Sequence, residues 1–182
     1  MDRLSISHPL DGVTPLVEHG IVASIALRTV MELRGKSTTL AERCPGLLPL
    51  MPNRTMPHDH WRAMWLRPNG WLLSSLPEEG GGRWPELMRA AQEGVCRVSD
   101  VSHGRVCIHS RGDAATVLLA KGTPLDLRPD RFPEGRCART WCAGFTVMLD
   151  RVGDGMDIYV DSSQAVAFWD WLIDAAVELR NG

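Results

Sequence analysis

The sequence predicts an α+β protein, because strand-like and helix-like segments alternate along its 182 residues. In the strand-like segments every second residue is apolar, and in the helix-like segments apolar residues recur three or four positions apart. The order strand, helix, strand, strand, helix occurs twice. Short sequence motifs also recur in the two repeats: residues 32–35 resemble residues 109–112, and residues 84–91 resemble residues 169–176.

These recurring motifs divide the chain into three parts. We expect an N-terminal arm at residues 1–20 and two β-α-β-β-α units at residues 21–94 and 95–182. In each unit the helices should pack on one face of an antiparallel sheet. An internal duplication explains the repeated motifs, and chance convergence of short motifs is the alternative. The arm either lacks order or lies along a partner protein.

The composition narrows the class of protein. A net charge of −2 and a hydrophobic content of 44% are typical of a globular protein and argue against nucleic acid as the main partner. No apolar run approaches the length of a membrane span, so no membrane partner is expected. Five cysteines without a Cys-x-x-Cys pair indicate reduced thiols in the cytoplasm.

The first unit contains three expected strands and two expected helices. Alternating residues predict one long strand over 21–33, and Asn69-Gly70 predicts a hairpin between two further strands. Ser37 is the expected N-cap of the first helix, and Pro85 opens the second helix, which Gly94 ends. The expected segments are strands 21–33, 61–66 and 71–76, helices 36–43 and 84–93, a proline-rich loop from 44 and a turn at 78–82.

The second unit follows the same order. Val106 and Ile108 should point to one face of its first strand, and Asp113 should cap the helix that follows. Met156, Ile158 and Val160 should share one face of a later strand. The expected segments are strands 95–110, 137–149 and 156–160, helices 113–121 and 163–180, and a loop at 122–136.

The final helix bears on possible partners. Its apolar face is expected to comprise Ala165, Trp169, Leu172, Ala176 and Leu179, widened by Val166, Phe168, Ile173 and Val177. Trp171 falls on the opposite, acidic side, near Glu178. An indole there is either a solitary surface residue or an anchor for another subunit.

Several groupings that could indicate catalysis or metal binding are weak. His58 and His60 could bind a metal, but they lie in a proline-bounded segment, and a surface loop is the better interpretation. The glycine run at 80–82 lacks the lysine of a phosphate-binding loop. Ser102 and His103 are adjacent on an expected strand and would point to opposite faces. We therefore predict no catalytic, cofactor-binding or metal-binding residue.

One stretch carries a family resemblance. Asp-Val-Ser-His-Gly-Arg at 100–105, Gly-Asp-Ala-Ala at 112–115 and Ala-Lys-Gly-Thr-Pro-Leu-Asp-Leu at 120–127 resemble the gamma subunit of heterotetrameric sarcosine oxidase. The resemblance covers about residues 60–176. Residues 100–176 are more distantly similar to the first module of the folate-binding aminomethyltransferases, which implies an aminomethyltransferase-like fold. The catalytic acidic pattern of those enzymes is missing, and Asp150 is expected to be a lone carboxylate with Arg151 as its surface partner.

The resemblance implies a subunit without chemistry of its own. Such a complex demethylates sarcosine to glycine, with hydrogen peroxide and formaldehyde or 5,10-methylenetetrahydrofolate as products. The implied partners are the alpha, beta and delta subunits, which would hold FAD, FMN, NAD, tetrahydrofolate and zinc. Trp171, Trp169, His103 and Arg105 are our candidate interface residues, the last two as part of the family signature.

Three alternatives remain open from the sequence. The chain could be the gamma subunit of a related complex that acts on another N-methyl amino acid. It could also be a stand-alone folate-binding module. A hydrolase that uses His103 is a third possibility, and it requires activity that is lost on His103→Ala without loss of the fold.

Overall fold

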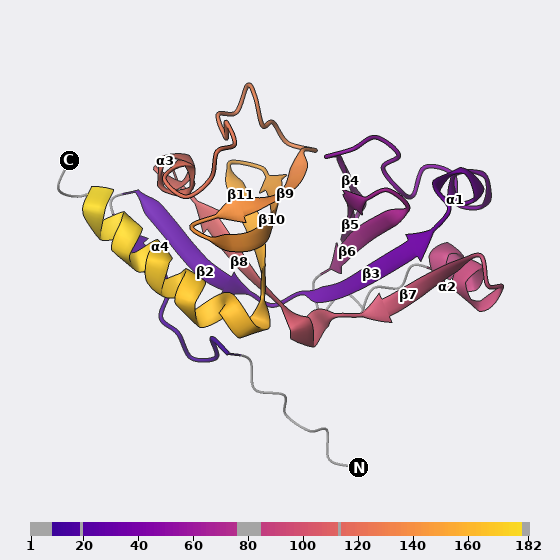
Figure 1. Ribbon diagram of the computed structural model, residues 1–182, viewed down its shortest axis with the longest axis horizontal. Helices are drawn as coiled ribbons and strands as arrows, with labels where there is room; N and C mark the ends of the chain where they lie inside the picture. Colours follow the sequence, from indigo (N-terminus) through magenta and orange to yellow (C-terminus); the bar gives the residue numbers. More distant parts are fainter. Residues whose placement is uncertain (1–8, 19, 76–84, 113, 180–182) are drawn as a thin grey trace, which may run out of the picture.

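The protein contains two antiparallel sheets, seen in a computed structural model that describes residues 9–18, 20–75, 85–112 and 114–179 (Figure 1). The first, six-stranded sheet has the order β1-β2-β8-β11-β10-β9. Its strands are β1 (Leu16–Glu18), β2 (Ile21–Ala26), β8 (Arg105–Arg111), β9 (Cys137–Cys142), β10 (Phe145–Val152) and β11 (Gly155–Asp161).

The second sheet has five strands in the order β4-β5-β6-β3-β7. They are β3 (Thr29–Gly35), β4 (Thr55–Pro57), β5 (Trp61–Arg67), β6 (Gly70–Ser75) and β7 (Cys96–Asp100). The α-helices are α1 (Ser37–Arg43), α2 (Pro85–Gln92), α3 (Ala115–Ala120) and α4 (Ala165–Leu179), with short 3-10 helices η2 (Ser102–Gly104) and η3 (Ser162–Gln164). This arrangement confirms the α+β class.

The molecule has four layers, because each sheet carries helices on its outer face. Leu118 of α3 and Phe168 of α4 pack with Ile108 of the six-stranded sheet. Apolar residues of α1 and α2 pack in the same way on the five-stranded sheet, around Leu33 and Leu73. A third cluster lies between the sheets and comprises Val30, Met64, Leu72, Cys107, Cys137, Met148 and Tyr159. Both faces of each sheet are therefore covered near its centre.

The predicted strand over residues 21–33 is wrong as a single element. It is interrupted at Leu27 and Arg28, and its two parts, β2 and β3, belong to different sheets (Figure 1). The predicted strand over 95–110 is divided in the same way, by η2, into β7 and β8. Alternation continues across the first break, through Ile25, Leu27 and Met31, so the pattern alone could not reveal it. At the second break the alternation stops between Val98 and Val106, where the sequence is mostly polar.

The two sheets consequently exchange strands. The strand β2 comes from the first predicted unit but pairs with β8, and β7 comes from the second unit but pairs with β3. Gly94 therefore does not separate the two sheets. The division of the chain into two repeated units remains a prediction.

Other expectations are corrected locally. The predicted strand 137–149 is a hairpin, with Ala143 and Gly144 both at positive φ in the turn between β9 and β10. Lys36, and not Ser37, occupies the N-cap of α1. The short strand β4 lies inside the predicted proline-rich loop. Residues 78–82, Trp84, Asp113 and Arg180 lie outside the described residues.

The hairpin at Asn69-Gly70 and the proline at the start of α2 are confirmed. So is the shared face of β11 formed by Met156, Ile158 and Val160, which packs against the helices. In α4, Phe168, Trp169 and Leu172 are buried as expected, whereas Val166, Ile173 and Val177 are exposed. None of the helices in the described part of the chain is long and apolar enough to span a membrane.

Candidate functional site

The most distinctive group of polar residues lies inside the protein, where the two sheets face each other. Asp150 of β10 and Asp157 of β11 are opposite one another in the strand register, and both are 0% exposed. An ionised carboxylate in such a place is costly unless it is paired and hydrogen-bonded. The partners of these two residues therefore define the site.

Asp150 is paired with the opposite sheet. Arg62 of β5 donates from Nε to Oδ2 at 2.6 Å and from Nη2 to Oδ1 at 3.3 Å. Thr55 donates its hydroxyl to Oδ1 at 2.7 Å. The expectation that Asp150 is a lone carboxylate with Arg151 as a surface partner is therefore wrong. Asp150 is buried, and the guanidinium of Arg151 instead donates to backbone carbonyls.

Asp157 binds residues from three segments. Arg28, from the link between β2 and β3, donates from Nη2 to Oδ2 at 2.9 Å. His109 of β8 lies with Nδ1 2.6 Å from Oδ1. Because an ionised carboxylate only accepts hydrogen bonds, this ring nitrogen carries the proton. Tyr159 adds a long contact to Oδ2 at 3.5 Å and donates to Ser74 Oγ of β6 at 2.9 Å.

The environments shift the pKa values of the two carboxyls in opposite directions. Burial is the largest influence on both and raises the pKa. In Asp157, the hydrogen bond from His109 and the charge of Arg28 outweigh burial, so its pKa lies below the usual value. In Asp150, burial outweighs the hydrogen bonds from Arg62 and Thr55, so its pKa is raised. Burial also raises the pKa of Cys107 and Tyr159, which keeps both protonated.

The chemistry available to this network is mainly structural. Asp157 orients the imidazole of His109, as an acidic residue does in many proton-transferring sites. The network has no reactive thiolate, because burial raises the pKa of Cys137 to about 12. Arg62 and Thr55 of the five-stranded sheet donate hydrogen bonds to Asp150 of the six-stranded sheet. Ser74 of the five-stranded sheet accepts a hydrogen bond from Tyr159 of the six-stranded sheet. The network therefore ties the two sheets together.

Two residues of the rejected triad, Asp100 and Ser102, have structural roles. Asp100 Oδ1 accepts from the backbone N–H of Ser102 at 2.9 Å and from its hydroxyl at 2.6 Å. The same hydroxyl oxygen accepts from the N–H of Val30 at 2.9 Å. His103 is exposed in η2 and takes no part in these bonds. This arrangement closes the turn into η2 and anchors it to β3.

The loop histidine His58 is likewise held by its neighbours. Its ring stacks on Trp61 with centroids 3.9 Å apart, and Nε2 lies 3.1 Å from the carbonyl oxygen of Leu47. Within the described residues, no group of three or more His, Cys, Asp or Glu side chains is placed to hold a metal ion.

The four candidate interface residues differ in how much of each side chain is exposed. Trp169 is only 4% exposed and belongs to the core, so it offers little surface to a partner. Trp171 is half-buried by its own chain, against Phe168 and Gly122. Arg105 begins β8 and lies 3.8 Å from Asp161. The interface role of Trp171, His103 and Arg105 remains a prediction.

The sequence interpretation missed one exposed tryptophan. Trp141 lies on β9, at the edge of the six-stranded sheet, and its side chain is 64% exposed. Trp141 is opposite Thr146 in the strand register, so its side chain lies on the face of the six-stranded sheet that points toward the second sheet. The second sheet does not cover this edge, and the indole stays exposed. The sequence pattern gave no direct indication of this exposure, because the β9–β10 hairpin was predicted as one strand.

Comparison with solved structures defines the architecture. A chain of the heterotetrameric sarcosine oxidase from Corynebacterium sp. U-96, solved in complex with pyrrole 2-carboxylate, matches with a TM-score of 0.77, 24% identity and 95% coverage of both chains. The glycine cleavage system aminomethyltransferase T from Bartonella henselae matches with a TM-score of 0.63 and 16% identity, covering 86% of this chain and 46% of that enzyme. The protein is thus of the aminomethyltransferase-like α+β class.

Sequence comparison gives the family. The model of the sarcosine oxidase, gamma subunit family matches residues 56–178, and the chain belongs to this family. It is 29% identical over 174 residues to the sarcosine oxidase subunit gamma of Arthrobacter sp., covering 93% of this chain and 83% of that relative. The corresponding subunit of Corynebacterium sp. (strain U-96) is 33% identical over 116 residues, covering 63% of this chain and 56% of the relative.

Proposed function

We propose that the chain is the gamma subunit of a heterotetrameric sarcosine oxidase. The observation that carries the proposal is the family match over residues 56–178, supported by similarity to the Arthrobacter subunit over most of both chains. The complex demethylates sarcosine to glycine, with hydrogen peroxide and formaldehyde or 5,10-methylenetetrahydrofolate as products. The chain is then part of an oxidoreductase whose other members are the alpha, beta and delta subunits.

The role within the complex is assembly. The buried network joins the two sheets of this chain, and its acidic groups are already paired with Arg62, Arg28 and His109. We assign FAD, FMN, NAD, tetrahydrofolate and zinc to the other subunits, as the family resemblance implies. The work of this chain is to present a rigid surface on which those subunits meet.

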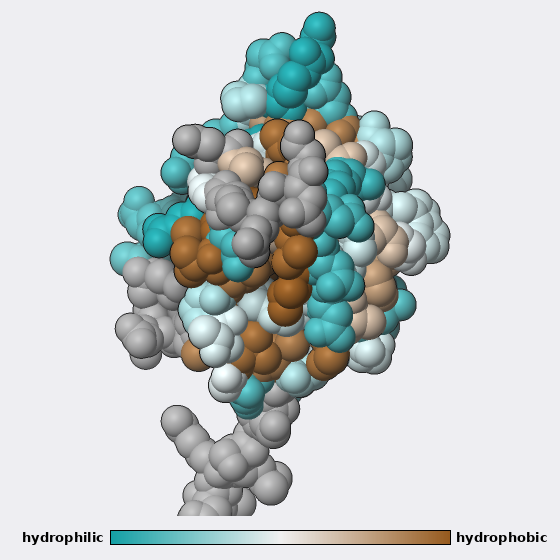
Figure 2. Space-filling model, turned by 90° about the vertical axis from the view of Figure 1, so that its left-hand side faces the viewer, coloured by the Kyte–Doolittle hydropathy of each residue, from teal (hydrophilic) through white to brown (hydrophobic). Residues whose placement is uncertain are grey.

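The exposed apolar residues support this role. Val17 of β1, Val117 of α3 and Val166, Ile173 and Val177 of α4 are all exposed. Figure 2 shows apolar surface on the side of the molecule where α3 and α4 lie. Apolar surface of this kind, together with a large exposed aromatic side chain such as Trp141, is typical of subunit interfaces.

Trp141 gives the sharpest test. Alanine at this position should weaken association with the partner subunits about tenfold or more, because a central aromatic anchor contributes strongly to an interface. The chain would be co-expressed with its partners, and the recovery of each subunit and the oxidase activity would be measured after affinity purification. Asp130→Ala, at another exposed position, is the control. A Trp141→Ala complex with unchanged composition and affinity would contradict the assignment of Trp141 to the interface.

The alternatives make different predictions. A stand-alone folate-binding module would bind a reduced folate tightly and saturably without partners, whereas a gamma subunit by itself would show neither such binding nor oxidase activity. A complex specific for another N-methyl amino acid would oxidise that compound faster than sarcosine. Calorimetric titration of the purified chain and oxygen-uptake assays of the complex separate these cases.

A further inference from the structure

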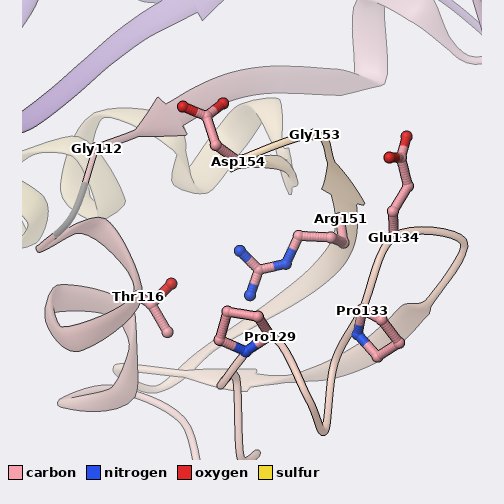
Figure 3. A pocket seen from close by; sticks show the side chains of 8 residues that line it. All are labelled: Gly112, Thr116, Pro129, Pro133, Glu134, Arg151, Gly153 and Asp154. Carbon is pink, nitrogen blue, oxygen red and sulfur yellow. The ribbon is translucent and has the colours of Figure 1, made fainter.

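A pocket lies on the outer side of the six-stranded sheet, on the opposite face of that sheet from the side chains of the buried network. It has a volume of about 520 Å³. Its walls come from the start of α3 and Gly112 shortly before it, the long loop before β9, the end of β10 and the β10–β11 turn (Figure 3). The lining residues are Gly112, Thr116, Pro129, Pro133, Glu134, Arg151, Gly153 and Asp154. Pockets of this size with a few polar groups are typical of small-molecule sites.

Arg151 is the unusual member of the pocket. The residue is only 4% exposed, yet no carboxylate among the described residues forms an ion pair with it. Its Nε donates to the carbonyl oxygen of Phe132 at 3.0 Å, and Nη2 donates to that of Leu127 at 2.5 Å. Burial lowers the pKa of this guanidinium, as expected for a cation without a paired anion.

Part of the guanidinium remains available for a ligand. Arginine has five N–H donors, and the two carbonyls take one from Nε and one from Nη2. Both N–H groups of Nη1 and the second of Nη2 therefore have no acceptor among the described residues. These atoms form the planar fork that binds a carboxylate through two parallel hydrogen bonds. In Figure 3 the guanidinium extends toward Thr116 and Pro129.

The remaining charges in the pocket determine the class of ligand. Glu134 and Asp154 also line it, and Figure 3 shows their carboxyl groups set apart from the guanidinium. Two carboxylates against one guanidinium disfavour a dianion such as phosphate. They favour a molecule that has a carboxylate at one end and a positively charged amino group at the other.

From this geometry we infer that the pocket binds a free amino acid. Its carboxylate pairs with Arg151, and its ammonium group lies toward Asp154 or Glu134. Thr116 adds a hydroxyl to the polar wall, and the rings of Pro129 and Pro133 form rigid apolar walls that a side chain can contact. The site belongs to this chain and is independent of the reaction proposed for the complex.

The test uses the full-length chain in complex with its partner subunits. The twenty common amino acids and sarcosine would be screened singly by ligand-observed NMR, and binders would be titrated by calorimetry. Thr116→Phe fills the pocket without altering the buried guanidinium, and Asp130→Asn is the control outside it. Because sites on other subunits are unaffected by Thr116→Phe, the binding that this variant removes belongs to the pocket.

We expect at least one amino acid to bind saturably to the wild-type complex and to the Asp130→Asn complex. The Thr116→Phe complex should bind that amino acid at one site fewer per gamma chain. Arg151→Lys keeps the charge but loses the fork, and should weaken this site about tenfold or more. The N-acetyl and amide derivatives of the amino acid that binds should show a similar loss of affinity for the pocket. The inference is overturned if Thr116→Phe removes no amino-acid binding, or if inorganic phosphate binds the pocket more tightly than every amino acid.

Discussion

At the scale of single residues, Asp150 and Asp157 show how neighbouring carboxylates acquire opposite properties. Both are buried and face each other across β10 and β11. Asp157 binds Arg28 and His109, which favour its ionised form, whereas burial dominates at Asp150 despite Arg62. Adjacent positions in one sheet can therefore contribute to stability with opposite dependence on pH.

The sign of each contribution follows from its pKa. The folded-state pKa of Asp157 is lowered, so its contribution is present above the unfolded value of about 3.9 and is lost as the pH falls through the folded value. The folded-state pKa of Asp150 is raised, so its contribution is full below about 3.9 and is lost as the pH rises through the folded value.

Asparagine substitutions test this contrast. The loss of stability caused by Asp157→Asn should be largest near neutral pH and should shrink as the pH falls below about 4. The loss caused by Asp150→Asn should instead grow as the pH falls toward 4. Urea unfolding, followed by tryptophan fluorescence at a series of pH values, measures both. Parallel pH dependence of the two variants would refute the assignment.

At the scale of elements, the contact between α3 and α4 depends on a residue without a side chain. Gly122 follows α3, and its backbone N–H bonds to the carbonyl of Leu119. A Cβ at this position would lie 2.7 Å from Trp171 Cη2 and 2.9 Å from Cys142 Sγ. The indole of Trp171 therefore lies directly over Gly122, which explains why this tryptophan is half-buried by its own chain.

Gly122→Ala should lower the free energy of unfolding by about 1–3 kcal/mol, because the new methyl group overpacks the α3–α4 contact. Gly104→Ala is the matched control: nothing lies within 4 Å of its added Cβ, so its effect should stay within about 0.5 kcal/mol. Adding Trp171→Leu to Gly122→Ala should restore part of the loss. Equal stability of the two single alanine variants would show that the close contact is unimportant.

At the scale of the whole molecule, the exchange of strands makes the two sheets interdependent. The strand β2 continues through Arg28 into β3, and β7 continues through η2 into β8, so two covalent crossings join the sheets. Arg62 to Asp150 and Ser74 to Tyr159 add polar contacts across the same interface. We expect the two sheets to unfold together in one transition.

Removing Arg62 tests the contact between the sheets. Arg62→Met should lower the free energy of unfolding by about 3–5 kcal/mol, because it leaves Asp150 as an uncompensated buried charge. The double variant Arg62→Met with Asp150→Leu should lose less, since neither charge remains. Urea unfolding of the three proteins gives the comparison. If Arg62→Met alone is as stable as the double variant, or more stable, the proposed role of the Arg62–Asp150 pair is contradicted.

The amino-acid sequence was enough to predict the class of fold, the hairpin at Asn69-Gly70, the apolar face of β11 and the family. These depend on short-range patterns and local motifs, which act within a few residues of one another. The exchange of β2 and β7 between sheets, the partners of Asp150 and the available N–H groups of Arg151 depend on contacts between distant parts of the chain. Alternation of apolar residues is the same whichever sheet a strand joins, and residues such as Arg62 and Asp150 become neighbours only when the two sheets meet.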